Sequence, residues 1–426
     1  VGQYGVERKY DQLLRGRAGR KLIEVDALGH EKRTISVDKP QAGHDLYLTI
    51  DFDLQRLAED LLGKEAGAII ALDPKTGETL ALASRPSFDP NSLSRGLSSK
   101  EWRGILQDKR HPLTNRAIQG LYPPGSTFKI IMATAALETN GTDMPDTIQC
   151  IGRFRFGNRT FRDWKVNGHG SMNLHSAMTH SCDVYFYKMG NRLGIENIAK
   201  YATLFGLGEK TGIDLPSEKS GIVPSPKWKE QTRGEPWYPG DTISVAIGQG
   251  YVTVTPIQMA KVIATISNNG VAHQPQLVRG IRRRNTGAIE TLPVPKPMSL
   301  GLQPNFVKNI QDSLASVVSN GTARQANSPL VTIAGKTGTS QVIALRSDKE
   351  KETPKEFRDH AWFVAYAPFE NPQIAVAVLA EHSGHGGSAA APLARQLIEA
   401  FIKKTGGKTQ VSELRDLRKN GMRRAP

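Results

Sequence analysis

Strand-like apolar segments stand near both ends of this 426-residue chain, with helical segments between them. Two nearly all-apolar arms, residues 68–72 and 79–83, flank a turn and predict a hairpin that is buried on both faces. Three further strand-like runs lie near the C-terminus, at residues 331–334, 361–366 and 374–380. This arrangement predicts one mixed α/β domain whose central sheet pairs segments that are distant in sequence.

Helical segments are expected where apolar residues recur at helical spacing between these strands. The predicted helices cover residues 53–62, 126–138, 174–189, 256–268 and 392–403, and a further strand covers residues 46–50. Residues 1–45 are charged and lack long apolar stretches, so we interpret them as a remnant of a smaller accessory domain. The main domain then spans residues 46–405, and residues 406–426 form a basic tail.

The charge balance limits the partners of the chain. It holds 56 Lys and Arg against 41 Asp and Glu, a surplus of 15 positive charges, which fits either an anionic partner or a solvated basic surface. Nucleic acid is not expected, since no aromatic residues interleave the basic tail and no zinc-finger or helix-turn-helix pattern is visible. No apolar run reaches the roughly 18 residues of a membrane span, and no signal peptide opens the chain. We therefore expect any membrane anchor to lie outside this sequence.

Ser126-Thr127-Phe128-Lys129 is a Ser-x-x-Lys motif at the start of a predicted helix. The spacing of three puts both side chains on one face, one turn apart. The helix N-terminus supplies unpaired N–H groups and a positive dipole end, which suit a developing oxyanion. A desolvated lysine can take the proton of a neighbouring serine and so activate it as a nucleophile. Taken alone, the motif more often marks an N-capping serine followed by a surface lysine.

Two further motifs give this serine a chemical context. Ser181-Cys182-Asp183 lies in a predicted helical stretch, and Lys336-Thr337-Gly338-Thr339-Ser340 follows a predicted strand. In the second motif the lysine supplies a cation and the two threonines supply hydroxyls for a carboxylate, while the glycine lets a substrate backbone approach the strand edge. The order Ser-x-x-Lys, Ser-x-Asp, Lys-Thr-Gly is that of the penicillin-binding proteins and serine β-lactamases.

On these motifs the sequence resembles the class B penicillin-binding proteins, and among them the elongation-type branch, penicillin-binding protein 2. The resemblance covers nearly the whole chain and includes Gly5-Val6-Glu7 of the family's membrane-proximal pedestal. The other blocks that carry it are residues 122–129, 237–242, 248–251, 255–259, 360–363 and 384–388. The resemblance implies a penicillin-binding transpeptidase fold, in which helices flank a central antiparallel sheet and residues 1–45 are the remnant of the pedestal.

The resemblance also implies an activity. The protein would be a D,D-transpeptidase that forms an acyl-serine intermediate from the D-Ala–D-Ala stem peptides of peptidoglycan, crosslinks them during cell elongation and is inhibited by β-lactams. Ser126 would attack the peptide carbonyl, and Lys129 would take its proton. Ser181 would relay a proton toward the leaving D-alanine, and Asp183 would orient Lys129 or bind the substrate backbone. The terminal carboxylate would be held by Lys336, Thr337 and Thr339, and the oxyanion hole would consist of the backbone N–H groups of Ser126 and Thr339.

Partners and location follow from the same resemblance. It implies a SEDS-type glycosyltransferase (RodA) in the membrane, MreC at the pedestal, and a periplasmic catalytic domain on the bacterial inner membrane. One position departs from the common family pattern, since many members carry Asn where Asp183 stands. The alternatives are a D,D-carboxypeptidase or β-lactamase, which resolve the acyl-enzyme with water, and a β-lactam-binding sensor, for which no signalling domain is visible.

The two cysteines of the chain predict a site that these motifs do not require. They occur in the series Cys150, Asp163, His169, Cys182, with twelve, five and twelve residues between successive members. Two thiolates, an imidazole and a carboxylate suit a tetrahedral zinc ion, which in a closed four-ligand site is structural and leaves catalysis without a cofactor.

Other readings of these residues stay open at the level of sequence. The cysteines are also compatible with a Cys150–Cys182 disulfide in an oxidising compartment or with two free buried thiols. His175 and His180 are alternative ligands.

Overall fold

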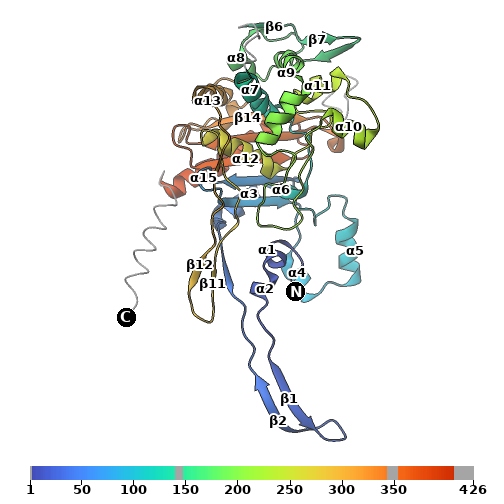
Figure 1. Ribbon diagram of the computed structural model, residues 1–426, viewed down its shortest axis with the longest axis vertical. Helices are drawn as coiled ribbons and strands as arrows, with labels where there is room; N and C mark the ends of the chain where they lie inside the picture. Colours follow the sequence, from blue (N-terminus) through green and yellow to red (C-terminus); the bar gives the residue numbers. More distant parts are fainter. Residues whose placement is uncertain (1, 140–146, 343–353, 407–426) are drawn as a thin grey trace.

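The computed structural model describes residues 2–139, 147–342 and 354–406. Its centre is a five-stranded antiparallel sheet in the order β14-β15-β16-β4-β5 (Figure 1). The strands are β4 (Gly67–Leu72), β5 (Thr79–Arg85), β14 (Ala334–Ser340), β15 (His360–Ala367) and β16 (Ile374–Ala380). Because β16 pairs with β4, the sheet joins the two ends of the chain. The mixed α/β fold with a central antiparallel sheet flanked by helices is therefore confirmed.

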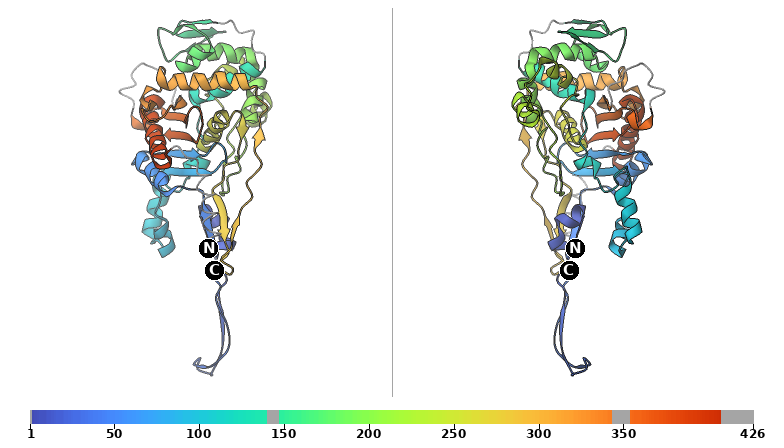
Figure 2. Two further views of the ribbon diagram at one scale, coloured as in Figure 1. Left: turned by 90° about the vertical axis from the view of Figure 1, so that its left-hand side faces the viewer. Right: turned by 90° about the vertical axis from the view of Figure 1, so that its right-hand side faces the viewer.

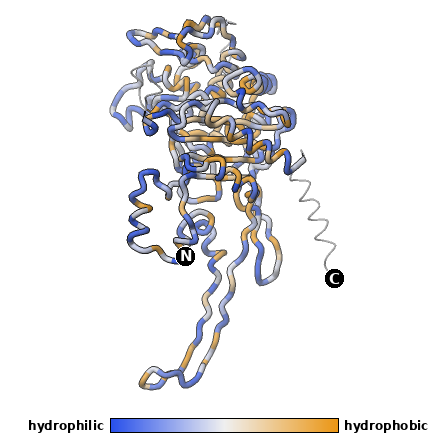
Figure 3. Tube along the Cα trace, turned by 180° about the vertical axis from the view of Figure 1, so that it is seen from behind, coloured by the Kyte–Doolittle hydropathy of each residue, from blue (hydrophilic) through white to orange (hydrophobic). Residues whose placement is uncertain are grey.

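Both faces of the sheet are buried, which explains why β4, β15 and β16 are almost continuously apolar (orange in Figure 3), whereas the edge strand β14 carries the polar Lys-Thr-Gly motif. On one face Ile70 and Trp362 belong to a core with α12 (Pro256–Ser267). On the other face Ile69 and Phe363 belong to a second core with α3 (Phe52–Leu62) and α15 (Ala391–Thr405).

A helical layer, here called the head, lies above the sheet in Figure 1. Its helices are α7 (Lys129–Glu138), α8 (Leu174–Thr179), α9 (Asp183–Leu204), α10 (Pro226–Arg233), α11 (Pro239–Val245) and α13 (Pro304–Ser319). Two small antiparallel pairs complete it: β6 (Ile148–Cys150) with β9 (Gly170–Met172), and β7 (Arg153–Phe156) with β8 (Arg159–Arg162).

The N-terminal segment extends away from the sheet on the opposite side. After α1 (Gly5–Lys9) and α2 (Asp11–Leu14), the antiparallel hairpin of β1 (Arg20–Val25) and β2 (Glu31–Asp38) projects from the body (Figures 1 and 2). Nearly all of its side chains are exposed. The hydroxyl of Tyr10 donates to Asp214 Oδ2 at 3.0 Å, which attaches α1 and α2 to the main body. The boundaries at 45/46 and 405/406 stay predictions, and residues 407–426 of the predicted tail lie outside the described residues.

Shorter elements connect these layers. A three-stranded sheet lies beside the N-terminal segment. Its strand order is β12 (Ile289–Thr291), β11 (Val278–Arg282), β3 (Asp45–Leu48). The remaining elements are α4 (Pro90–Arg95), α5 (Ser99–Gln107), α6 (Arg116–Gln119), α14 (Gly386–Ala389), the pair β10 (Val271–Ala272) and β13 (Met298–Ser299), and the 3₁₀ turns η1 (Gly125–Phe128), η3 (Arg324–Ala326) and η5 (Lys355–Phe357). None of the described helices has both the length and the apolar composition to cross a membrane.

Three predicted segments differ from the structure, and each difference concerns a motif. The predicted helix 126–138 starts as the 3₁₀ turn η1 and becomes α-helical only at Lys129. The predicted helix 174–189 is two helices, because Ser181 adopts a positive φ of 55° between α8 and α9. The predicted strand 331–334 is in fact the approach to β14, which begins at Ala334 and contains the Lys-Thr-Gly motif itself.

Candidate active site

The three motifs, more than fifty residues apart in sequence, meet at the edge strand β14. Ser126 lies in η1, which packs against β14, and Lys129 is the first residue of α7. Ser181 lies in the connection between α8 and α9, and Asp183 opens α9. The structure thus brings together the predicted catalytic residues, including Lys336 on β14.

Lys129 is the centre of this cluster and is completely buried. Its Nζ donates to Asp183 Oδ1 at 2.6 Å, to the Ser181 carbonyl at 2.8 Å and to Ser181 Oγ at 3.3 Å. The ring centroid of Phe186 lies 5.2 Å from the same nitrogen. The positive φ of Ser181 turns both of its oxygens toward Lys129, which a continuous helix would not do.

Ser126 is half-buried, and its hydroxyl makes no hydrogen bond within the described part of the chain. In this structure Lys129 therefore interacts with the Ser-x-Asp motif and leaves Ser126 Oγ available to a ligand. Gly125, immediately before it, has a positive φ of 54°, and a Cβ there would lie 2.5 Å from the Thr339 carbonyl oxygen. The nucleophile turn and β14 are in such close contact that only glycine fits at this position.

Lys336 is the second buried lysine of the site, and its Nζ donates to the Thr337 carbonyl at 3.2 Å. Burial lowers the pKa of Lys336 well below its usual value; the charge of Lys129 adds to this effect and Asp183 opposes it. The Thr337 hydroxyl pairs with that of Thr322 at 2.7 Å. Thr339, half-buried, presents its backbone beside Gly125.

A buried network that sequence reasoning missed holds the segment before Ser126. The Pro123 carbonyl accepts hydrogen bonds from Trp362 Nε1 at 3.1 Å and from the Ser340 hydroxyl. Glu381 Oε1 accepts from the Tyr122 hydroxyl at 2.5 Å and from Arg116 Nε at 2.8 Å. The resemblance had marked residues 122 and 360–363, but no sequence pattern links Tyr122 to a carboxylate 259 positions away.

The predicted metal ligands Cys150, Asp163, His169 and Cys182 also come together, with one ligand atom from each lying within 4.8 Å of the others. Asp163 Oδ2 lies 3.5 Å from Cys150 Sγ and 3.4 Å from Cys182 Sγ. His169 Nδ1 lies 3.4 Å from Asp163 Oδ1 and 3.7 Å from Cys150 Sγ. Zinc bonds of about 2.0–2.3 Å in a tetrahedron place ligand atoms about 3.3–3.8 Å apart, so the donor types and these four contacts, which use both oxygens of Asp163, are compatible with the ion.

The structure also bears on the alternative interpretations, which were a disulfide, two free thiols, and His175 or His180 as ligands. Both cysteines are free and buried, and burial raises the pKa of the Cys182 thiol. His175 is outside the cluster, because its two ring nitrogens meet the hydroxyls of Ser313 and Ser316 at 3.1 and 3.0 Å. The ring of His180 stacks on that of His169 with centroids 6.2 Å apart.

The cysteine–aspartate–histidine cluster is joined directly to the catalytic one. Asp163 Oδ2 accepts from the backbone N–H of Val184 at 3.0 Å. The backbone N–H of Trp164 donates to Asp183 Oδ2 at 3.3 Å, and its indole N–H donates to the His180 carbonyl at 3.2 Å. The loop that carries Asp163 is therefore held against the first turn of α9.

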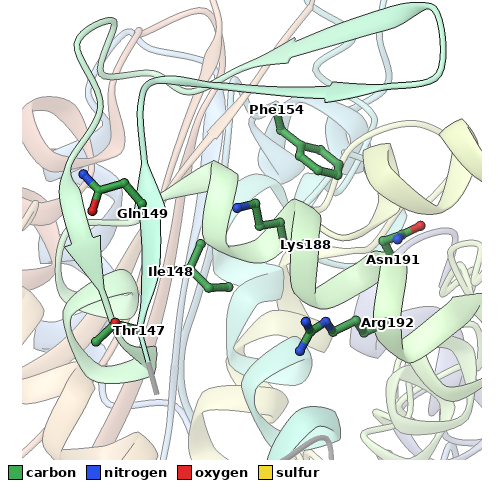
Figure 4. Close-up of a pocket in the computed structure, with 7 residues that line it drawn as sticks. All are labelled: Thr147, Ile148, Gln149, Phe154, Lys188, Asn191 and Arg192. Atoms are coloured by element: carbon green, nitrogen blue, oxygen red, sulfur yellow. The ribbon is translucent and has the colours of Figure 1, made fainter. Parts of the chain in front are cut away.

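A separate cavity of about 380 Å³ lies in the head between β6 and α9 (Figure 4). It is lined by Thr147, Ile148, Gln149, Phe154, Lys188, Asn191 and Arg192. None of the motif residues lines it, so it is separate from the catalytic cluster.

Comparison with known proteins agrees with this geometry. The family described as "Penicillin binding protein transpeptidase domain" matches residues 67–399, and "Penicillin-binding Protein dimerisation domain" matches residues 1–48. The chain is 41% identical over 407 residues to the peptidoglycan D,D-transpeptidase MrdA of Acinetobacter baumannii, covering 94% of this chain and 60% of the relative. It is 38% identical over 411 residues to the MrdA of Escherichia coli K12, covering 94% and 64%. The chain thus spans about three fifths of the length of these curated relatives.

Solved structures have the same fold. The Pseudomonas aeruginosa PBP2 in complex with WCK 5153 superposes with a TM-score of 0.80 at 36% identity, over 94% of this chain and 84% of that one. The PBP2 of a complex with MreC from Helicobacter pylori also gives 0.80, at 34% identity over 95% and 72%. Since the matched domain contains all three motifs and the sheet that unites them, the chain belongs to the penicillin-binding protein transpeptidase family.

Proposed function

We propose that this chain is the catalytic part of a peptidoglycan D,D-transpeptidase that acts through an acyl-serine intermediate. The observation that carries the proposal is the buried Lys129, which binds both residues of the Ser-x-Asp motif one helical turn from an unengaged Ser126. Relatives from A. baumannii and E. coli carry the name of this activity.

In the proposed acylation, Ser126 Oγ attacks the carbonyl carbon of the D-Ala–D-Ala bond. The new ester bond forms as the peptide bond breaks, and the released D-alanine amine gains the proton that the serine loses. Lys129 accepts that proton as the general base, and Asp183 Oδ1, 2.6 Å away, stabilises the ammonium group that results. Ser181 Oγ, 3.3 Å from Lys129 Nζ, passes the proton on to the leaving amine.

The edge of β14 is the proposed binding surface for the substrate. Lys336 supplies an amino group whose charged form a bound carboxylate would favour, and the hydroxyls of Thr337 and Thr339 supply donors for the terminal carboxylate. Gly338 has no side chain to block the approach of a peptide backbone. The backbone N–H groups of Ser126 and Thr339 stabilise the oxyanion of the tetrahedral intermediate.

Covalent labelling with a fluorescent penicillin tests the nucleophile. The wild-type chain should form a stable adduct whose tryptic peptide carries the label on Ser126, and Ser126→Ala should form none. Ser94→Ala, which alters an exposed serine in α4, is the control and should label normally. Persistent labelling of Ser126→Ala would refute the assignment, and rapid release of hydrolysed penicillin would identify a β-lactamase instead.

Transfer to an amine distinguishes the proposed reaction from its nearest alternative. With a D-Ala–D-Ala pentapeptide and an acceptor amine such as a D-amino acid, a transpeptidase should yield the exchanged peptide. Exclusive release of the hydrolysed tetrapeptide would identify a D,D-carboxypeptidase.

The proposed partners follow from the family and its structures. A PBP2 from H. pylori is described in complex with MreC, and a related chain in a peptidoglycan synthase complex of polymerisation and crosslinking. We extend this to MreC binding at the N-terminal hairpin, to a RodA-type glycosyltransferase, and to a location on the bacterial inner membrane with the catalytic domain in the periplasm. Cross-linking of the hairpin to MreC in cells, abolished by deletion of residues 20–38, would test the first of these contacts.

We further propose that Cys150, Asp163, His169 and Cys182 hold a structural zinc ion. Four contacts among these residues, made through both oxygens of Asp163, measure 3.4–3.7 Å, and a closed site with four protein ligands leaves no position for a reactive water. The role of the ion is to fix the loop that contacts Asp183. It takes no part in the reaction.

Native mass spectrometry tests the metal site without reference to activity. The wild-type chain should carry one zinc ion and lose it to a chelator, with a lower Tm, and Cys182→Ser should carry none. His175→Gln, which changes a nearby histidine outside the cluster, should keep the ion. A mass lower by two hydrogens would identify a disulfide, and a metal-free, unshifted mass would refute the site.

A further inference from the structure

The turn that follows α11 contacts both sides of the proposed oxyanion hole. It consists of residues 247–250, with positive φ angles at Gly248 (73°) and Gly250 (75°). Its own backbone is fixed by Gly248 N–H donating to the Val245 carbonyl at 2.8 Å and Gln249 N–H donating to the Ser244 carbonyl at 3.1 Å. The turn is therefore a rigid extension of the helix.

One hydrogen bond leads from this turn to each of the two segments that supply the oxyanion donors. The Gly248 carbonyl accepts from the backbone N–H of Gly125, next to Ser126, at 2.9 Å. The Gln249 side chain donates through Nε2 to the Thr339 carbonyl at 3.1 Å. Two consecutive residues thus bind the nucleophile turn and the β14 strand separately.

The approach of these segments leaves no spare space. A Cβ on Gly248 would lie 2.1 Å from the Gly125 carbonyl oxygen. A Cβ on Gly125 would lie 2.5 Å from the Thr339 oxygen and 3.1 Å from the Thr339 nitrogen, so the N–H and C=O edge of Thr339 faces the nucleophile turn. The nucleophile turn therefore packs backbone against backbone on Gly248 at one side and on Thr339 at the other.

β14 needs such a support because it is the outermost strand of the sheet. Within the described residues its backbone pairs with β15 on one side alone. The opposite edge, which carries the Thr339 groups, has no strand to fix its peptide orientation. The Gln249 amide supplies one hydrogen bond of the kind that a neighbouring strand would otherwise supply.

We infer that the Gly248–Gln249 turn sets the spacing and direction of the two oxyanion donors, and that Gln249 is a positioning residue for acylation. This inference rests on the proposed function. Gln249 touches no reacting atom; it fixes the Thr339 carbonyl and, through the Thr339 Cα, restrains the Thr339 N–H of the preceding peptide. An oxyanion hole is effective only when both donors lie about 2.7–3.1 Å from the developing oxyanion, so a small rotation of one donor is costly.

Two substitutions remove the hydrogen bond in different ways. Gln249→Leu has no donor, and Gln249→Glu keeps the size of the side chain but offers only acceptors to the Thr339 carbonyl while it is ionised. Loss of one complete oxyanion donor lowers such rates about 10²–10³-fold, so we expect a misdirected donor to slow penicillin acylation about 10- to 100-fold. Gln311→Leu is the matched control, since its Nε2 donates to the Ile266 carbonyl at 2.8 Å and to Asn269 Oδ1 at 3.2 Å, neither of which belongs to the three motifs.

A spectroscopic signature separates positioning from a general loss of structure. In infrared difference spectra of the penicillin acyl-enzyme, with the ester carbonyl labelled with ¹³C, the wild type should show a strongly hydrogen-bonded band. Both Gln249 variants should show a second band at higher frequency, and Gln311→Leu should not. For Gln249→Glu the acylation rate relative to wild type should recover as the pH falls and the carboxyl becomes a donor.

The outcomes separate the two levels of the proposal. If the wild-type chain is not acylated at Ser126, the proposed function itself fails. If it is acylated, and both Gln249 variants acylate within about twofold of it with an unshifted carbonyl band, the positioning role alone is wrong. A rate loss of equal size in Gln311→Leu, with no change in any band, would also overturn it in favour of a purely structural effect.

Discussion

Replacing Asp183 by alanine removes the carboxylate that pairs with a fully buried lysine. Lys129 Nζ lies 2.6 Å from Asp183 Oδ1, and the two side chains are 0% and 13% exposed. The other acceptors of the ammonium group, both from Ser181, are neutral. Removing one partner of a buried ion pair costs about 3–5 kcal/mol, because the remaining charge stays desolvated without a counter-ion.

The size of the expected effect can be stated as a change in melting temperature. With an unfolding entropy of about 2.1 cal/mol/K per residue over a domain such as residues 67–399, this cost lowers Tm by about 4–7 °C. Asp183→Asn keeps one acceptor oxygen for Lys129, but it loses the charge assistance and turns its NH₂ group toward the Trp164 N–H; at about 2–3 kcal/mol in all, its Tm should fall by about 3–4 °C. Differential scanning calorimetry measures both.

An exposed pair of the same kind provides the control. Lys308 and Asp312 are 2.9 Å apart but 57% and 46% exposed, so Asp312→Ala should cost no more than about 1 kcal/mol. The reasoning is refuted if Asp183→Ala melts within about 1 °C of the wild type. Equal losses in Asp183→Ala and Asp183→Asn would show that the charge, and not the acceptor oxygen that asparagine keeps, accounts for the cost.

For three further substitutions the structure predicts the direction of the change in Tm or in penicillin labelling. Burial, with a smaller effect of His382, lowers the pKa of His360 to about 4. As the pH falls from about 6.5 to 4, the unfolded chain binds a proton at this group before the folded chain does. The stability that the neutral His360 contributes, about 3 kcal/mol, is therefore present above this pH range and is lost as the pH falls through it. The Tm difference between wild type and His360→Gln should shrink between pH 7 and pH 4, and a constant difference would contradict this. Glu381→Ala leaves the Arg116 guanidinium without its 2.8 Å partner and should lower Tm by several degrees, whereas an unchanged Tm would show that water replaces the carboxylate. Gly125→Ala places a methyl group 2.5 Å from a carbonyl oxygen at positive φ and should abolish penicillin labelling, and labelling at the wild-type rate would show that the turn can shift.

The sequence was informative where chemistry or periodicity leaves a mark on individual residues. Successive residues of a strand face opposite sides of the sheet, and here both sides are covered, so the strands appear in the sequence as continuous apolar runs. For this reason β16 and the β4–β5 hairpin were predicted nearly to the residue. The four cysteine, aspartate and histidine residues were grouped correctly because few other residue types bind zinc. Likewise, the three motifs were recognised by their order along the chain, because Ser-x-x-Lys alone also occurs at the start of ordinary helices.

The break between α8 and α9 and the polar contacts between residues distant in sequence could not be predicted, because they leave no pattern in the local sequence. Nothing in the composition of residues 174–189 indicates that Ser181 adopts a positive φ, since the residues around it favour a helix. This conformation depends on the buried ammonium of Lys129, which lies 52 positions earlier in the chain. The same holds for Gln249, whose partner Thr339 is 90 positions away. Tertiary contacts override local propensity at such positions.

The aspartate at position 183 uses its two oxygens in two different directions. Oδ1 accepts from Lys129 and Oδ2 accepts from the backbone N–H of Trp164, whereas an asparagine would face one of these donors with its own NH₂ group. The neighbouring Asp163 accepts in turn from the N–H of Val184, so two successive loop residues are bonded to two successive residues of α9 in opposite donor sense. Such a crossed pair resists both sliding and rotation of the loop, because either motion breaks a bond. A shift of Asp163 therefore changes the position of the Asp183 carboxylate that binds Lys129. The positions of the proposed zinc ligands and of the proposed catalytic lysine are thus coupled through the first turn of α9.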